Sequence, residues 1–136
     1  MIKAIFFDFY GVLESQALPN QQLLDYIKTD LKSKYKLGII SNAADDYMYE
    51  IIPRNELEAI FDVISVSYIV GFAKPDERIY EFTADKAGIK PSEAIFIDDI
   101  MDFCKAAEDV GMQAILYRDF SQTKAELEKL LTDPNN

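Results

Sequence analysis

Acidic and polar side chains follow three apolar stretches of this chain, at the point where each stretch ends. Asp8 follows the first stretch, Ser41 and Asn42 follow the second, and Asp98 with Asp99 follow the third. A carboxylate at the end of a buried strand is costly, but open α/β sheets hold ligands and metals at the carboxyl ends of parallel strands. We therefore expect these side chains to converge at one edge of a sheet.

Lys74 lies in a loop before a predicted helix, from which its ammonium group can reach the same edge. Three carboxylates placed close together repel one another unless a hard divalent cation lies among them. Ligand sets made only of oxygen favour Mg²⁺. The residue types therefore predict a Mg²⁺ site with one hydroxyl and one ammonium group beside it.

Short apolar runs alternate with amphipathic stretches along the chain, a pattern typical of right-handed crossovers and a parallel sheet. The predicted fold is α/β, a three-layer α/β/α Rossmann-like sheet of about five strands, in a single domain over residues 1–136. A polar connector is expected at 14–20 and a loop at 71–75. The predicted strands lie at 5–7, 36–41, 62–66, 94–98 and 112–117, and the predicted helices at 21–34, 43–52, 55–60, 75–87, 102–110 and 122–131.

Composition excludes several classes of function. The net charge of −10 argues against binding to nucleic acid or to an anionic membrane, either of which needs a basic face. The chain has no His, so Ser-His and Cys-His chemistry and His-ligated zinc are excluded. Its single cysteine, Cys104, is expected to be a buried apolar group. With neither a cleavable leader nor an apolar run of membrane-spanning length, we expect a cytoplasmic protein.

Each candidate site residue also has an ordinary structural interpretation. Asp8 could cap the turn after its strand, and Ser41 or Asn42 could cap the next helix. Lys74 precedes Pro75, which is a common first residue of a helix, and the acid pair after the fourth strand could cap the helix that follows it. The sequence taken one motif at a time leaves these alternatives open.

Four motifs follow one another along the chain: Asp8-x-Tyr10-Gly11-Val12, Ser41-Asn42, Lys74-Pro75 and Asp98-Asp99. Together and in this order they resemble those of the haloacid dehalogenase superfamily, whose members are mostly Mg²⁺-dependent phosphatases on a Rossmann-like sheet. The blocks ISNAADD, GFAKPDERIY and IFIDDIMDFCKAAEDVGMQAILY are most similar to the subgroup that includes the phosphatase domain of soluble epoxide hydrolase.

The resemblance implies a nucleophile and a metal site. Asp8 would be the nucleophile and would form an aspartyl intermediate. Mg²⁺ would be held by Asp8, by the backbone carbonyl of Tyr10 and by Asp99. Asp98 would act through a water molecule or from the outer coordination sphere, without binding the ion directly.

The resemblance also implies a site for the transferred phosphoryl group. Ser41 and the backbone around Asn42 would donate hydrogen bonds to its oxygens, and Gly11 belongs to the same substrate-binding set. Lys74 would neutralise charge on both Asp8 and the phosphoryl group, since phosphoryl transfer depends chiefly on positioning and charge stabilisation.

Tyr10 departs from the pattern of the phosphatases, which carry a second Asp at this position as general acid and base. Positioned proton transfer contributes roughly 10²- to 10⁴-fold in rate, so hydrolysis of an ordinary phosphomonoester should be slow. The dehalogenases of the superfamily do have Tyr there. They tend to lack the acid that Asp99 supplies, however, and they place an Arg from the cap or its entry near the halide. Arg54, Arg78 and Arg118 all fall elsewhere in this sequence.

The spacing of the motifs predicts a domain without a cap. Asp8 and Ser41 are 33 positions apart, as are Ser41 and Lys74, and both intervals are filled by predicted sheet and helix. An uncapped site is open to water and to large substrates. Either the phosphorylated substrate is bulky, or a partner subunit in a homo-oligomer covers the site.

The leading interpretation is a Mg²⁺-dependent phosphatase that acts through an aspartyl-phosphate intermediate, with weak turnover because of Tyr10. Two alternatives remain. One is a binding or regulatory module that keeps the fold and has lost catalysis, and the other is a hydrolase of the 2-haloacid dehalogenase type.

Overall fold

The five predicted strands pair in parallel in the computed structural model, which describes residues 1–135. Their order across the sheet is β5-β4-β1-β6-β7, so β1 is central. Together with the helices on both faces, this confirms the predicted three-layer α/β fold. The strands are β1 (Ala4–Phe7), β4 (Lys36–Ser41), β5 (Val63–Val66), β6 (Ala94–Asp98) and β7 (Gln113–Leu116).

The register of the sheet determines which polar residues become neighbours. Phe7 of β1 lies level with Ile39 of β4 and with Ile97 of β6. Asp8 and Asp98 each follow by one residue, and they therefore leave adjacent strands at the same height. Parallel pairing thus brings together carboxylates that are 90 positions apart in the sequence.

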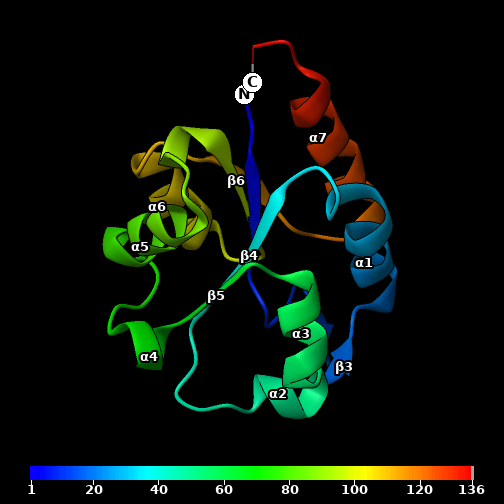
Figure 1. The fold of residues 1–136 in the computed structure, drawn as a ribbon, viewed down its shortest axis with the longest axis vertical. Helices are drawn as coiled ribbons and strands as arrows, with labels where there is room; N and C mark the ends of the chain where they lie inside the picture. The colour runs from blue at the N-terminus through cyan, green and yellow to red at the C-terminus, as the bar shows by residue number, and fades with distance from the viewer. Residues whose placement is uncertain (136) are drawn as a thin grey trace.

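Helices cover both faces of the sheet. In Figure 1, α1 (Gln21–Tyr26) and α7 (Phe120–Thr132) lie on one side, and α5 (Glu77–Ala87) and α6 (Met101–Asp109) lie on the other. Two apolar clusters fill the spaces between the layers. Every residue of β1 is buried, which explains its uninterrupted apolar sequence.

The segments that follow the carboxyl ends of the strands gather at one end of the molecule. At the lower end of Figure 1 lie β3 (Leu18–Pro19), α2 (Met48–Ile51), α3 (Arg54–Ile60) and α4 (Ser67–Val70). The start of β1 and the end of α7 lie at the opposite end. Any site built on the strand ends is therefore remote from both chain termini.

The stretch 14–20 is not the polar connector that the sequence predicts. It forms a short antiparallel hairpin of β2 (Glu14–Ser15) and β3, and its two turn residues, Gln16 and Ala17, have φ values of 53° and 61°. The Glu14 carboxylate accepts a hydrogen bond of 3.0 Å from the backbone N–H of Ala17. This bond holds a turn conformation that is uncommon for residues other than Gly.

Several helix boundaries also differ from the prediction. The helix expected at 21–34 continues from α1 into a π-helical turn, η1 (Ile27–Leu31), and the one expected at 43–52 is reduced to α2. The helix expected at 75–87 begins at Glu77, because Asp76 provides the N-cap by accepting a hydrogen bond from the Arg78 N–H. The sequence did not indicate α4 or the 3₁₀ turn η2 (Pro91–Glu93).

Cys104 is buried in α6, as the sequence predicts. Burial raises the pKa of its thiol to about 12, so the thiol stays protonated at neutral pH. No helix in the described part of the chain has the length and apolar character needed to span a membrane.

Gly38 of β4 leaves room for the ring of Phe6 on the neighbouring strand. A Cβ at this position would lie 2.7 Å from Phe6 Cδ1 and 3.3 Å from the Val63 carbonyl oxygen. We expect Gly38→Ala to lower the free energy of unfolding by about 1–3 kcal/mol, the usual cost of overpacking. Urea unfolding measures this loss, and Phe6→Leu in the same chain should recover part of it. An additive double variant would contradict the proposed clash.

Candidate functional site

Lys74 lies buried between two carboxylates at the carboxyl edge of the sheet. Its Nζ is 2.8 Å from Asp8 Oδ1 and 2.7 Å from Asp98 Oδ2. Only 1% of the Lys74 side chain is exposed, and Asp98 is fully buried. The ammonium group therefore joins β1 to β6 in surroundings where an unpaired charge would be strongly destabilising.

One ammonium group does not neutralise the carboxylates around it. Burial raises the pKa of Asp8 to about 8; Lys74 acts in the opposite direction, and the charge of Asp98 adds to the rise. Burial also raises the pKa of Asp98. The cluster therefore holds a proton, or needs an additional positive charge before both acids can be ionised.

Asn42 fixes the backbone at Lys74. Its Nδ2 donates to the Lys74 carbonyl at 2.9 Å, and its Oδ1 accepts from the Lys74 N–H at 2.8 Å. The Asn42 side chain therefore holds the segment that carries the lysine and does not cap the following helix. Asp76, two residues on, caps α5, so this segment is both a helix start and the support of a buried cation.

Asp99 completes a group of three carboxylates. One ligand oxygen from each of Asp8, Asp98 and Asp99 lies within 4.8 Å of the others. Asp99 itself is exposed, so the group reaches the surface. Such a set of hard oxygen donors fits Mg²⁺, which binds through carboxylates and keeps several waters.

Gly11 is required beside this group for steric reasons. It has a φ of +88°, and a Cβ there would lie 2.3 Å from Asp99 Oδ2. No other residue type fits this position without moving the Asp99 carboxylate. The structure thus places Gly11 next to the carboxylate group, where it supports the position of Asp99.

Ser41 contributes a buried hydroxyl whose Oγ has no hydrogen-bond partner in the described part of the chain. An unsatisfied buried polar group costs about 1–3 kcal/mol. The hydroxyl does not cap a helix, contrary to the ordinary structural interpretation of this residue. It remains available to a ligand that brings a hydrogen-bonding group.

The Tyr10 side chain is partly buried and packs edge-on against Phe9, with 5.0 Å between the ring centroids. Burial raises the pKa of its phenol above 10, and the carboxylates of Asp45 and Glu14 add to this. The phenol is therefore neutral at physiological pH. It cannot replace a carboxylate as a general base.

A polar cavity of about 470 Å³ adjoins the carboxylate group. It shares Gly11 and Asp99 with that group and extends to Asn20, Tyr117 and Arg118. The motifs did not indicate these last three residues. Arg118 and Tyr117 follow the end of β7, and a position after a strand end was the one available signal.

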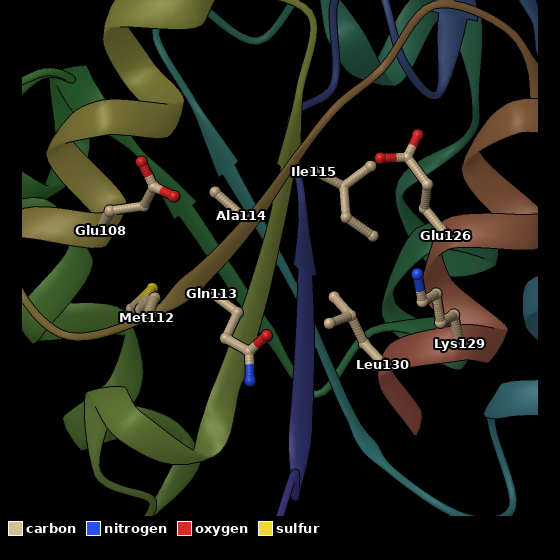
Figure 2. A pocket seen from close by; sticks show the side chains of 8 residues that line it. All are labelled: Glu108, Met112, Gln113, Ala114, Ile115, Glu126, Lys129 and Leu130. Atoms are coloured by element: carbon tan, nitrogen blue, oxygen red, sulfur yellow. The ribbon is translucent and has the colours of Figure 1, made fainter. Parts of the chain in front are cut away.

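A second cavity, of about 440 Å³, lies beside the edge strand β7 (Figure 2). Glu108 of α6 and Glu126 of α7 lie on its two sides, with Ala114 and Ile115 of the strand between them. None of the predicted site residues lines it. It is a separate surface feature.

Comparison with known proteins identifies the family of the chain. The profile of a family described as haloacid dehalogenase-like hydrolase matches residues 5–117. Rat bifunctional epoxide hydrolase 2 is 43% identical over 75 residues, which are 55% of this chain and 14% of that protein. The glyceraldehyde 3-phosphate phosphatase of Methanothermobacter thermautotrophicus is 38% identical over 93 residues, which are 64% of this chain and 39% of that protein. The chain thus spans well under half the length of these relatives.

Solved structures share the fold at low sequence identity. An uncharacterised protein from Corynebacterium glutamicum has a TM-score of 0.84 at 20% identity, covering 96% of this chain and 95% of its own. A wild-type HAD family enzyme from Bacteroides thetaiotaomicron, in complex with magnesium and inorganic phosphate, has a TM-score of 0.73 at 19% identity. That match covers 90% of this chain and 99% of the enzyme. At these identities the likeness supports the fold alone.

Removal of the buried cation should destabilise the chain in a pH-dependent way. Without Mg²⁺, we expect Lys74→Met to lower the free energy of unfolding by about 3 kcal/mol at pH 7.5, because it leaves two buried carboxylates without a positively charged partner. Their pKa values then lie further above those of the unfolded chain, so the folded state holds protons that the unfolded state releases. Stability therefore falls as the pH rises, and the loss should be smaller at pH 5.

Urea unfolding at the two pH values measures this difference. The matched control is Lys34→Met, which removes an exposed lysine and should change the free energy of unfolding by less than about 0.5 kcal/mol. An equal loss at pH 5 and pH 7.5 for Lys74→Met would show that packing, and not charge, explains the effect.

Proposed function

Because the chain belongs to the haloacid dehalogenase-like hydrolase family, we propose that it is a Mg²⁺-dependent phosphatase with Asp8 as its nucleophile. The observation that carries the proposal is the buried ion cluster of Lys74, Asp8 and Asp98, with Asp99 beside it. A carboxylate can approach a phosphate dianion only where cations offset the repulsion, and this cluster supplies such a place.

The two oxygens of Asp8 are in different surroundings. Oδ1 accepts hydrogen bonds from the Phe9 N–H at 2.9 Å and from Lys74 Nζ at 2.8 Å. Within residues 1–135, Asp8 Oδ2 accepts no hydrogen bond, so its lone pairs are available to a substrate. In the proposed reaction one carboxylate oxygen of Asp8 forms a bond to phosphorus as the bond to the alcohol oxygen breaks. Water then hydrolyses the resulting aspartyl phosphate.

The proposed Mg²⁺ ligands are Asp8, the Tyr10 backbone carbonyl and Asp99, with Asp98 acting through water. Their carboxylates converge, and Mg²⁺ favours such donors. When bound there, the cation offsets negative charge on the phosphoryl oxygens. Asp98 also accepts hydrogen bonds from the Ile100 N–H at 3.0 Å and from Lys74 Nζ at 2.7 Å. We therefore propose that it orients the segment that carries Asp99.

Three further groups are proposed to hold the transferred phosphoryl group. Ser41 Oγ is buried without a partner, and a phosphoryl oxygen would satisfy it. Lys74 donates to Asp8 and is placed to share its charge with the substrate. The backbone around Asn42 is proposed to donate hydrogen bonds to the remaining phosphoryl oxygens, and Gly11 is proposed to contact the same group.

Tyr10 is the observation that favours a second candidate, a binding or regulatory module without catalysis. Its neutral phenol cannot provide the acid and base catalysis of a carboxylate. We therefore propose that turnover is weak. We also propose that a bulky substrate or a partner subunit covers the open edge of the site. The cytoplasmic location remains a prediction from the sequence.

The nucleophile is tested with an aryl phosphate substrate. Hydrolysis should require Mg²⁺ and stop when the metal is chelated, and Asp8→Asn should lower kcat by at least about 100-fold, because the variant lacks the attacking carboxylate. The matched control is Asp102→Asn, an exposed acid in the first turn of α6 that should retain activity. Equal activity of Asp8→Asn and the parent would refute the mechanism.

Tyr10→Asp tests the cause of the weak turnover. Restoring a carboxylate should raise kcat on an alkyl phosphate by about 10²-fold, since a poor leaving group needs a proton. The gain on an aryl phosphate should be smaller because an aryl oxide leaves without one. Steady-state rates on both substrates measure this. If neither rate rises, Tyr10 does not limit catalysis.

A further inference from the structure

The polar cavity beside Asp99 has the position of a substrate subsite. It lies between the β2–β3 hairpin, the start of α1 and the turn from β7 to α7, and Gly11 and Asp99 belong both to it and to the carboxylate group. Its volume of about 470 Å³ is within the usual range for small-molecule sites, roughly 300–1,000 Å³. It therefore suits the alcohol part of a small phosphomonoester better than a macromolecule, so a partner subunit, and not a bulky substrate, is the way of closing the open edge that agrees with it.

Asn20 is one of the residues that line this cavity, and its side chain connects the segments around it. Its Nδ2 donates to the Val12 carbonyl at 2.9 Å and to the Tyr117 hydroxyl at 2.8 Å, and its Oδ1 accepts from the Leu23 N–H at 3.4 Å. These bonds link the strand-end loop of β1 to that of β7. The cavity is thus preformed by hydrogen bonds between segments that are distant in the sequence.

Besides Asp99, two carboxylates line the cavity, and backbone groups already engage both of them. Glu14 accepts from the Gly11 N–H at 3.2 Å and from the Ala17 N–H at 3.0 Å. Asp119 accepts from the Gln122 N–H at 2.8 Å as the N-cap of α7. Their lone pairs serve the local fold and are less available to a ligand.

Arg118 is the one basic residue among those that line the cavity. The arginines Arg54 and Arg78 pair with Asp46 and Asp76, whereas Arg118 forms no ion pair within residues 1–135. Its backbone N–H donates to Gln122 Oε1 at 3.0 Å, so the main chain beneath the side chain is held. An unpaired guanidinium is a suitable partner for a carboxylate.

We propose that this cavity binds the alcohol part of the substrate and that Arg118 selects small phosphomonoesters that carry a carboxylate. The inference rests on the proposed function, because it assigns the phosphoryl group to the adjoining carboxylate group. No bond is made or broken at Arg118, which acts as a specificity-determining residue.

Binding of a matched pair of phosphonates tests this without turnover. Calorimetry in the presence of Mg²⁺ compares 3-phosphonopropionate with 3-phosphonopropionamide, which differ only in the carboxylate. The parent chain should bind the acid about fivefold more tightly, as expected for one accessible ion pair. Arg118→Ala should reduce the ratio to about one, and Arg118→Lys should retain part of it.

Lys34→Ala is the control for net charge, because Lys34 is exposed and lies before the amino end of β4, whereas the cavity lies at the carboxyl ends of the strands. It should leave the fivefold ratio unchanged. Equal affinity of the parent for both phosphonates, binding of neither, or a preference that survives in Arg118→Ala would overturn the proposal. Hydrolysis of aryl phosphate is measured separately. If the parent chain prefers the acid but hydrolyses no phosphate, the proposed phosphatase activity is refuted and the proposed binding site for the carboxylate is retained.

Discussion

The structure depends on the burial of one ammonium group between two carboxylates. Lys74 carries the single positive charge in contact with Asp8 and Asp98, and nearly all of its side chain is removed from water. A buried ion pair is weak evidence for stability in itself, because desolvation of both partners is costly. Its presence at the carboxyl edge of the sheet is therefore not explained by stability alone.

Two local constraints keep this cluster in place. The Asn42 side chain forms hydrogen bonds with both backbone groups of Lys74, and Asn42 follows β4, the strand next to the one that Asp8 follows. On the other side, Gly11 leaves the space that Asp99 occupies. The carboxylates of the cluster thus come from the ends of β1 and β6, Lys74 is held through the residue that follows β4, and the sheet acts as a rigid frame for charges that repel one another.

The sequence was most informative where burial is complete. β4 and β6 have the predicted bounds, because strands covered on both faces need uninterrupted apolar residues and their polar ends stand out. The convergence of Asp8 and Asp98 followed from parallel pairing.

Other contacts leave no local pattern in the sequence. The two hydrogen bonds between the Asn42 side chain and the Lys74 backbone join residues that are 32 positions apart. The β2–β3 hairpin depends on the Glu14 carboxylate, and the cavity beside Arg118 depends on a bond from Asn20 to Tyr117, so neither could be seen in the sequence.

Both ends of the described chain lie at the amino edge of the sheet, across the molecule from the strand ends that carry Asp8 and Asp98 (Figure 1). A polypeptide joined to Met1 or extending beyond α7 would leave from that side and would not cross the mouth of the cluster. The charged centre is thus built entirely by the turns at the opposite side of the sheet, and its geometry is independent of the path that the chain takes before β1 and after α7.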